Sequence, residues 1–199
     1  DALRMSNLGE KCERKLWYRQ NQPSTAEPLP GPTLLKFLIG YIIEEVVLSL
    51  AEQAGHTVSG RQDTLLLEGV TGHRDAIIDG VLVDVKSANS RGMDKFTSHR
   101  LEHDDPFGYL DQLDAYLTSS QDHPALKVRG EAAFLAVDKE LGHLVLDKYK
   151  KRDKPWKEII ERMREMLSSK EPPQRAYKPE PHGKAGNLAI PMPCKYCQY

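Results

Sequence analysis

The 199-residue sequence lacks the features that mark membrane and secreted proteins. It has no uninterrupted run of about 18 apolar residues, the length that a membrane-spanning helix needs. Its longest apolar segment, residues 34–50, contains one lysine, one glycine and two glutamates. The N-terminus lacks the charged-then-apolar layout of a signal peptide, and no internal repeat or low-complexity tract is evident. We therefore expect a soluble, cytoplasmic protein without a membrane partner.

The sequence also has little excess charge and few cysteines. Its net charge is −1 and its pI is near 6.7, so any surface that binds nucleic acid must be a local patch. Its three cysteines are Cys12 and the close pair Cys194 and Cys197. In an intracellular protein, an odd number with one Cys-x2-Cys pair favours metal binding over disulfides. Three unrelated buried thiols are the alternative interpretation.

The most informative segment is 72–86, Gly-His-Arg-Asp-Ala-Ile-Ile-Asp-Gly-Val-Leu-Val-Asp-Val-Lys. Asp79-Gly80 predicts a two-residue hairpin loop, which would place Asp75 opposite Asp84 in the ladder. Lys86 would then project on the same side as Asp84, because side chains alternate along a strand. Two facing carboxylates repel each other, and a divalent cation would offset that repulsion. Two carboxylates and a lysine around a metal indicate phosphate chemistry.

The hydrophobic pattern predicts an alternation of helices and strands. We expect helices at 6–20 (with Ser6 as the N-cap), 33–53, 106–119 and 155–168, and strands at 56–60, 63–70, 72–78, 81–87, 130–138 and 142–149. This order indicates an α/β or α+β arrangement around a central sheet that is at least partly antiparallel. We predict one domain over 1–199, with a core at about 33–168. The N-terminal segment 1–32 and the proline-containing tail 169–199 would carry the cysteines.

Two helices supply further candidate residues. On the wheel of helix 33–53, Glu45 lies on a polar stripe, whereas Glu44 lies among apolar residues, one turn after Gly40. A charge there is costly unless it binds a metal or forms a salt bridge with a nearby Arg or Lys. We expect Gly40 to let another backbone approach that carboxylate. Gln112 and Tyr116 share a face of helix 106–119, which is a weak signal taken alone.

Together, Gly40-x3-Glu44, Gly72-x2-Asp75, Asp84-x-Lys86 and Gln112-x3-Tyr116 resemble the motif series of RecB-like nucleases in the PD-(D/E)XK superfamily. Cys12-Glu-Arg-Lys-Leu-Trp-Tyr with Cys194-x2-Cys197 is similar to the iron–sulfur subgroup of these nucleases. That subgroup includes CRISPR-associated RecB-like exonucleases, AddB-type nuclease domains and phage exonucleases. The resemblance extends from Cys12 to Cys197. It implies a restriction-endonuclease-like core, a central mixed β-sheet flanked by helices.

The resemblance also implies a role for each candidate residue. Glu44, Asp75, Asp84 and the backbone carbonyl of Val85 would bind Mg²⁺ or Mn²⁺, which prefer oxygen ligands. Lys86 would position or deprotonate the attacking water, or offset charge on the phosphate. Gln112 would orient Lys86, and Tyr116 would contact the DNA strand. We further expect Arg91 and Lys95, just after the active-site strand, to grip the DNA backbone near the cut.

The resemblance implies a [4Fe-4S] cluster held by Cys12, Cys194 and Cys197. The fourth cysteine of the subgroup is expected a few residues after Cys197, beyond Tyr199. A non-cysteine ligand, or no cluster at all, are the alternatives. The cluster would clip the N-terminal helix to the C-terminal tail and would have a structural role, because closing so long a loop stabilises most in theory.

We therefore predict a metal-dependent DNA nuclease, most simply an exonuclease on single strands or duplex ends. The resemblance suggests work in recombination, repair, phage DNA metabolism or CRISPR adaptation, with protein partners in such a complex. Three rivals stay open: an endonuclease on the same core, a catalytically idle DNA-binding or scaffold module, and an iron–sulfur electron-transfer protein. The basic run 148–154, with Trp156 nearby, is either a phosphate-contacting patch or a solvated loop.

Overall fold

The computed structural model describes residues 3–199, with only the backbone at Met192, so residues 1–2 of the predicted N-terminal segment lie outside the described residues. The α-helices are α1 Glu13–Asn21, α2 Gly31–Gln53, α3 Ser90–Thr97, α4 Tyr109–Ser119 and α5 Trp156–Leu167. The strands are β1 Val58–Ser59, β2 Thr64–Leu67, β3 Val70–His73, β4 Ala76–Ile78, β5 Val81–Ala88, β6 Glu131–Asp138, β7 Leu144–Lys150, β8 Glu180–His182 and β9 Asn187–Ala189. Short 3₁₀ turns are η1 Met5–Asn7, η2 Pro23–Thr25 and η3 Met192–Tyr196.

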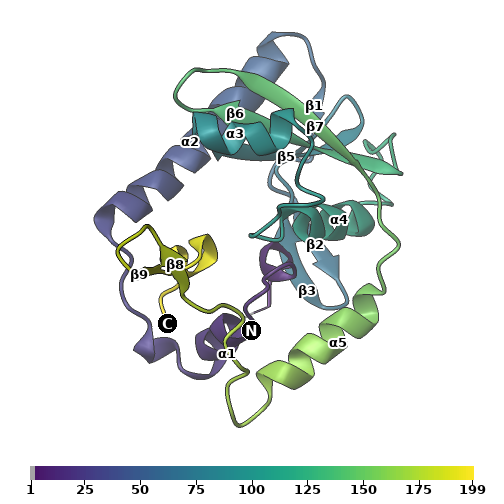
Figure 1. Ribbon diagram of the computed structural model, residues 1–199. Helices are drawn as coiled ribbons and strands as arrows, with labels where there is room; N and C mark the ends of the chain where they lie inside the picture. The colour runs from purple at the N-terminus through teal and green to yellow at the C-terminus, as the bar shows by residue number, and fades with distance from the viewer. Residues whose placement is uncertain (1–2) are drawn as a thin grey trace.

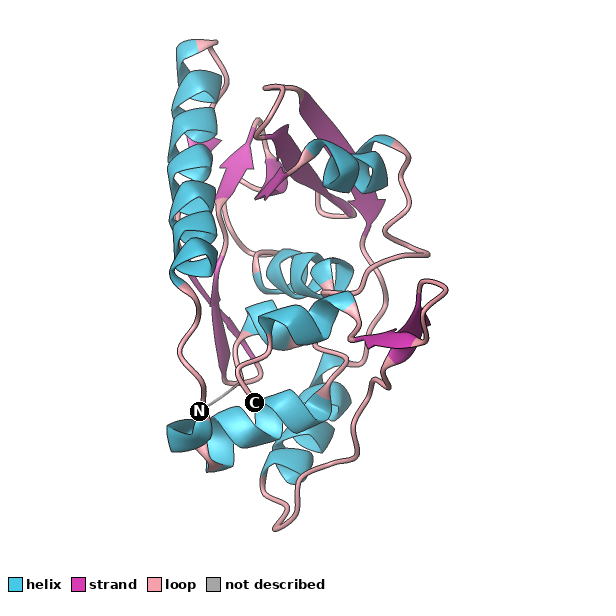
Figure 2. Ribbon diagram, turned by 60° about the vertical axis from the view of Figure 1, so that its left-hand side comes forward, coloured by secondary structure: helices cyan, strands magenta, loops and turns pink. Residues whose placement is uncertain are grey.

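A five-stranded mixed sheet forms the centre of the fold, in the order β1-β4-β5-β6-β7. Strands β5 and β6 are parallel, and the other neighbours are antiparallel. A parallel pair needs a long crossover, which here contains α3 and α4. Helix α2 lies along one face of the sheet and α3 along the other (Figures 1 and 2). The predicted central mixed sheet flanked by helices is thus confirmed.

The two faces of β5 serve two different cores. Val85 packs with Ala76 and with Val47 and Leu48 of α2, on one face of the sheet. Leu82 belongs to the larger core on the other face, which includes residues of α3, α4 and β6. Because side chains alternate along a strand, Asp84 and Lys86 share this second face with Leu82. The sequence pattern had placed Asp84 and Lys86 on one side, and the structure agrees.

The hairpin loop has the predicted register, but its ladder is shorter than predicted. Asp79 and Gly80 have φ values of 52° and 87°, and the pairs run from Ile78↔Val81 to Ala76↔Val83. There the ladder ends, because residues 70–73 pair with β2 instead of β5. The predicted strand 72–78 is therefore two strands, and the predicted ladder pairing of Asp75 with Asp84 is wrong.

A buried arginine explains why the chain turns between β3 and β4. Arg74 is 2% exposed. Its guanidinium donates to the carbonyl of Gly60 (3.0 Å) and to Ser120 Oγ (3.1 Å), and it pairs with Asp63. A buried guanidinium must satisfy its donors, and these partners lie away from β5. The arginine thus takes its neighbour Asp75 out of the ladder.

The N-terminal helix begins later than predicted. Residues 5–7 form only one 3₁₀ turn, and α1 begins at Glu13, so Ser6 is not its N-cap. Met5 is fully buried, and the backbone of Gly9 lies against that of Gly108, at the start of α4. These tertiary contacts outweigh the local helical pattern of the first residues.

The N-terminal and C-terminal segments meet, as the sequence led us to expect. Helices α1 and α5 pack together, and Trp17 Nε1 donates to the carbonyl of Ser169 (2.9 Å). At the chain end, the rings of Tyr18 and Tyr199 stack with centroids 5.9 Å apart. Among residues 3–199, no helix combines the length and apolarity needed to cross a bilayer.

Gly72, the first residue of the Gly72-x2-Asp75 motif, has a packing role that can be tested. A Cβ at this position would lie 2.8 Å from Met5 Cβ and 2.9 Å from Tyr116 Cε1. We expect Gly72→Ala to lower the free energy of unfolding by about 1–3 kcal/mol through overpacking. Gly130→Ala is the control, because its Cβ would meet nothing within 4 Å. Urea denaturation measures both, and equal stabilities would contradict the packing role.

Candidate active site

Asp84 and Lys86 form an ion pair on β5, in which Asp84 is buried and Lys86 is partly exposed. Asp84 is 1% exposed, and its Oδ2 lies 2.5 Å from Lys86 Nζ. That oxygen has no partner with hydrogen-bond geometry among the described residues. Burial lowers the pKa of Lys86, but the charges of Asp84 and Asp75 outweigh burial and raise it above its ordinary value. Lys86 is therefore a fixed cation at physiological pH.

Asp75 lies beside this pair, although not opposite Asp84 in the ladder. Its Oδ2 accepts a hydrogen bond from the backbone N–H of Val85 (2.7 Å), the residue between Asp84 and Lys86. Burial, and next the charge of Asp84, raise the pKa of Asp75 to about 8. Two carboxylates so close, with so little water, cannot both ionise cheaply. The electrostatic conflict read from the sequence is thus present, in a geometry other than the predicted one.

Glu44 approaches the same place from α2. Its Oε1 accepts a hydrogen bond from Gln62 Nε2 (2.5 Å), and burial raises its pKa, with a further contribution from Asp84. A salt bridge of Glu44 with a nearby Arg or Lys was the alternative interpretation. The nearby Arg61 pairs with Glu45 instead. Gly40 does not admit a close backbone: a Cβ there would meet only Ser87 Oγ, at 3.7 Å. That expectation was wrong, because the space beside Gly40 is an open groove.

A chain of polar contacts holds Lys86 from the side of α4. Lys86 Nζ donates to Gln112 Oε1 (3.4 Å), and Gln112 Nε2 donates to the hydroxyl of Tyr116 (2.8 Å). The ring of Tyr109 lies 5.0 Å from the ammonium group, close enough for a cation–π interaction. The structure thus brings Gln112 to the lysine, and its orienting role stays a prediction.

Tyr116 has a more enclosed position than a DNA-contacting residue needs. Its side chain is 4% exposed, and burial, followed by the charge of Asp84, raises its pKa to about 12. Its observed contacts are Gln112 and the packing against Gly72. The predicted contact with DNA stays a prediction, and the observed hydrogen bond of its hydroxyl is with Gln112.

The two cations expected to grip DNA lie on α3. Lys95 Nζ pairs with Asp104 Oδ2 (2.8 Å), and Lys95 lines a small cavity together with Lys86. Arg91 is exposed at the start of the same helix. Both residues stay candidates, with Lys95 the nearer to the site.

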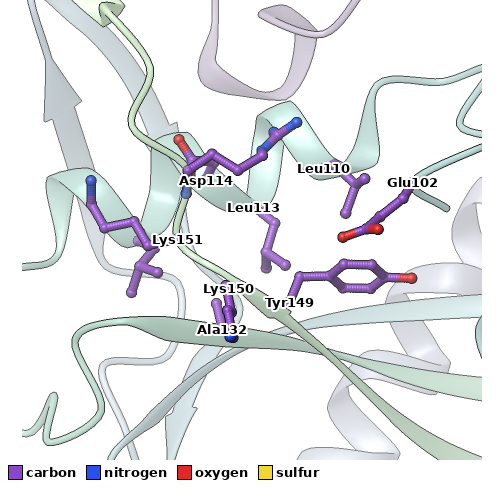
Figure 3. Close-up of a pocket in the computed structure, with 10 residues that line it drawn as sticks. Glu102, Leu110, Leu113, Asp114, Ala132, Tyr149, Lys150 and Lys151 are labelled. Carbon is purple, nitrogen blue, oxygen red and sulfur yellow. The ribbon is translucent and has the colours of Figure 1, made fainter. Parts of the chain in front are cut away.

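The basic run at 148–154 serves mainly internal contacts. Arg152 and Lys154 pair with Asp111, and Trp156 is buried, its Nε1 donating to Asp114 Oδ2 (3.0 Å). Lysines 150 and 151 line a pocket between α4 and β7 with Tyr149 (Figure 3). That pocket does not include Lys86. Lys148 and Lys150 lie on β7, so the run is not a solvated loop throughout, and the buried Trp156 is not available to stack on a base. The phosphate-contacting patch stays a prediction.

Two residues that shape the site are not predicted by the sequence pattern. Arg74 fixes the turn that carries Asp75, and Gln62 holds the carboxylate of Glu44. A sequence signal existed only for Arg74, an arginine directly before a motif aspartate in an apolar stretch. Gln62 lies in a loop and gives no such signal.

The three cysteines line one cavity between the start of α1 and the C-terminal tail. They are free thiols, and burial, followed by the charges of Cys12 and Cys197, raises the pKa of Cys194. Arg14, Lys15, Arg175 and Lys178 line the same cavity. The predicted convergence of Cys12 with the C-terminal pair is thus present.

The candidate ligands of the carboxylate site and of the thiol cavity are not arranged in coordination geometry among the described residues. Within the described part of the chain, no three His, Cys, Asp or Glu side chains are grouped as a metal site. The donor types still fit the predicted metals. In the carboxylate site the candidate ligands are all oxygen atoms, as Mg²⁺ and Mn²⁺ prefer, and Asp84 Oδ2 is buried without a hydrogen-bond partner among the described residues. The thiol cavity offers three of the four sulfur ligands that a [4Fe-4S] cluster uses. Both ligand sets stay predictions.

Comparison with solved structures identifies the class of fold. The alkaline exonuclease LHK-Exo from Laribacter hongkongensis superimposes with a TM-score of 0.51, at 12% identity, over 83% of this chain and 84% of that chain. LHK-Exo in complex with dAMP gives a TM-score of 0.44, at 14% identity, over 78% and 74%. No protein-family model matches the sequence, and no curated protein is significantly similar to it. The fold is restriction-endonuclease-like, as the motif resemblance implied.

The raised pKa of Asp75 predicts a pH-dependent stability in the metal-free protein. Between its ordinary pKa of 3.8 and its folded value of about 8, the folded state binds a proton that the unfolded state releases. Stability should therefore fall as pH rises through this window, with a slope approaching about 1.4 kcal/mol per pH unit. Asp75→Asn should flatten this fall, and the exposed Asp122→Asn should not. Denaturation in chelator across this pH range provides the measurement. If stability fell with pH at the same slope in wild type and Asp75→Asn, Asp75 would not be the group responsible.

Proposed function

We propose that the protein is a metal-dependent DNA nuclease that removes nucleotides from the ends of strands. The observation that carries this proposal is the meeting of Asp75, Asp84 and Lys86 in one largely enclosed site, with Glu44 at its edge. Such a site is costly to assemble, since the charge of Asp84 raises the pKa of both Asp75 and Glu44. A purely structural role would be met at lower cost by apolar residues.

The residues divide the work of hydrolysis between them. Asp75, Asp84 and Glu44 would hold Mg²⁺ or Mn²⁺ with the carbonyl of Val85, because hard cations prefer oxygen ligands. The bound ion would lower the pKa of water and polarise the phosphate. Lys86 stays protonated, so it would hold the attacking water and offset charge that develops on the phosphate. Gln112 keeps Lys86 in place, and Tyr116 keeps Gln112 in place.

The nuclease proposal is tested with three DNA substrates, linear single-stranded, linear duplex and closed circular, each with Mg²⁺ or Mn²⁺. We expect metal-dependent release of nucleotides from linear DNA, and a loss of at least about 100-fold in rate for Lys86→Ala, since a cation that meets developing charge is removed. Lys157→Ala, exposed on α5, is the matched control. Absence of metal-dependent cleavage of every substrate would overturn the proposal.

Two further outcomes separate the rivals. Cleavage of closed circles would assign an endonuclease, and tight DNA binding without cleavage would assign an idle binding module. Lys86→Ala leaves Asp84 buried without its cation, which destabilises proteins. Circular dichroism must therefore show that the variant is folded, and Lys86→Gln, a longer polar replacement, gives a second test of the same charge.

We also propose that the cysteine cavity holds an iron–sulfur cluster. Support comes from the convergence of three free thiols from opposite ends of the chain, in a cavity lined by four basic residues. Thiolates carry negative charge, which Arg14, Arg175 and Lys178 would offset, whereas Lys15 already pairs with Glu10 (2.6 Å). The cluster would join α1 to the tail, so its contribution would be to stability rather than to hydrolysis.

Anaerobic purification tests the cluster directly. We expect iron and acid-labile sulfide in the wild-type protein, and their loss together with a lower melting temperature in Cys194→Ser, because one thiolate ligand is removed. Lys86→Ala should retain the iron. An iron-free wild-type protein that melts at the same temperature as Cys194→Ser would refute the proposal.

A further inference from the structure

An open groove runs beside the carboxylate site, between α2 and the segment that precedes α4. Its volume is about 480 Å³, and it reaches from Glu44 and Lys86 out to the solvent side of α2. Five of its twelve lining residues are aromatic: Phe37, Tyr41, Phe107, Tyr109 and Tyr196. Aromatic residues make up only 7% of the sequence, so their concentration here needs a physical reason.

One wall of the groove consists of two exposed rings on α2. Phe37 is 47% exposed and Tyr41 is 68% exposed. The two residues are four apart, so their rings project from the same side of the helix. Gly40 lies between them on that side and has no side chain to fill the groove. The rings therefore present accessible faces toward the groove.

The opposite wall leads to the active-site lysine. The ring of Phe107 stacks on that of Tyr109, with centroids 5.6 Å apart, and meets the ring of Tyr196 edge-on at 6.1 Å. Tyr109 in turn lies 5.0 Å from Lys86 Nζ. A flat group that enters the groove thus meets aromatic rings on both sides and a cation at its inner end.

Two further lysines line the groove. Lys36 comes from α2 and Lys139 from the turn after β6, and both are exposed. Neither forms a salt bridge within the part of the chain that the structure describes, in contrast to Lys95 and Lys154. Unpaired ammonium groups next to aromatic rings are the combination that binds single-stranded nucleic acid, where rings stack on bases and cations meet phosphates.

We propose that this groove binds a single DNA strand, with unpaired bases stacked on Phe37 and Tyr41 and the backbone led toward Lys86. This inference rests on the proposed nuclease function and names its substrate as single-stranded. Bases in a duplex cover each other's faces, so only unpaired bases can insert between the two walls. Recognition by stacking is tolerant of sequence, since every base has a π-face.

The test measures binding in chelator, so that it does not depend on hydrolysis. The probes are fluorescent oligo(dT), an abasic oligonucleotide of equal length, and a blunt duplex, followed by anisotropy. Tyr41→Ala should weaken oligo(dT) binding roughly tenfold, and Phe37→Ala with Tyr41→Ala further, whereas abasic binding should not change. Tyr41→Trp should restore affinity. Ile42→Ala is the matched control, because Ile42 is 53% exposed on the same helix but does not line the groove.

Three results would overturn the stacking groove: unchanged oligo(dT) affinity in the double variant, an equal loss on the abasic probe, or an equal loss on the duplex. Failure of the groove and failure of the nuclease function are distinguishable. Metal-dependent cleavage with no effect of Tyr41→Ala on binding would refute only the groove. Ring-dependent binding of oligo(dT) without cleavage of any substrate would refute only the nuclease.

Discussion

The burial of the Asp84 carboxylate beside Lys86 on the central strand β5 is the constraint on which the rest of the structure depends. An ion pair that is removed from water costs free energy unless each charge is satisfied by its surroundings. Here Asp75 adds a second carboxylate, and Gln112 and the Tyr109 ring contact the lysine. Each of these partners is held by its own neighbours. The site is therefore supported by contacts from many parts of the chain.

The supports come from segments that are distant from the site residues in the sequence. Arg74 is buried away from the site, yet its three partners fix the turn that sets the position of Asp75. Gly72 lets Tyr116 approach the small sheet of β2 and β3, and Tyr116 then holds Gln112. The glycine and the tyrosine that appear as separate motif residues in the sequence are thus in contact with each other. The Gly72 and Tyr116 motif positions are therefore linked by packing as well as by their proposed part in the site.

Much of this arrangement could be predicted from the sequence, for identifiable reasons. The turn at Asp79-Gly80 and the alternation along β5 are local properties, so the hairpin register and the shared face of Asp84 and Lys86 were foreseen correctly. The point at which the ladder ends was not predicted, because it depends on partners of Arg74 from distant parts of the chain. The identity of Glu44's partner, Gln62, was missed for the same reason. Local rules carry no information about which remote groups satisfy a buried charge.

The contact of Gly9 with Gly108 has a consequence for where the chain can be shortened. Met5, Leu16 and Trp17 are buried in the same core as α4, and Gly9 touches the residue at which that helix begins. A fragment trimmed to residues 33–168 would expose this apolar surface and remove the support of the helix that carries Gln112. The buried residues of this segment are thus an integral part of the hydrophobic core.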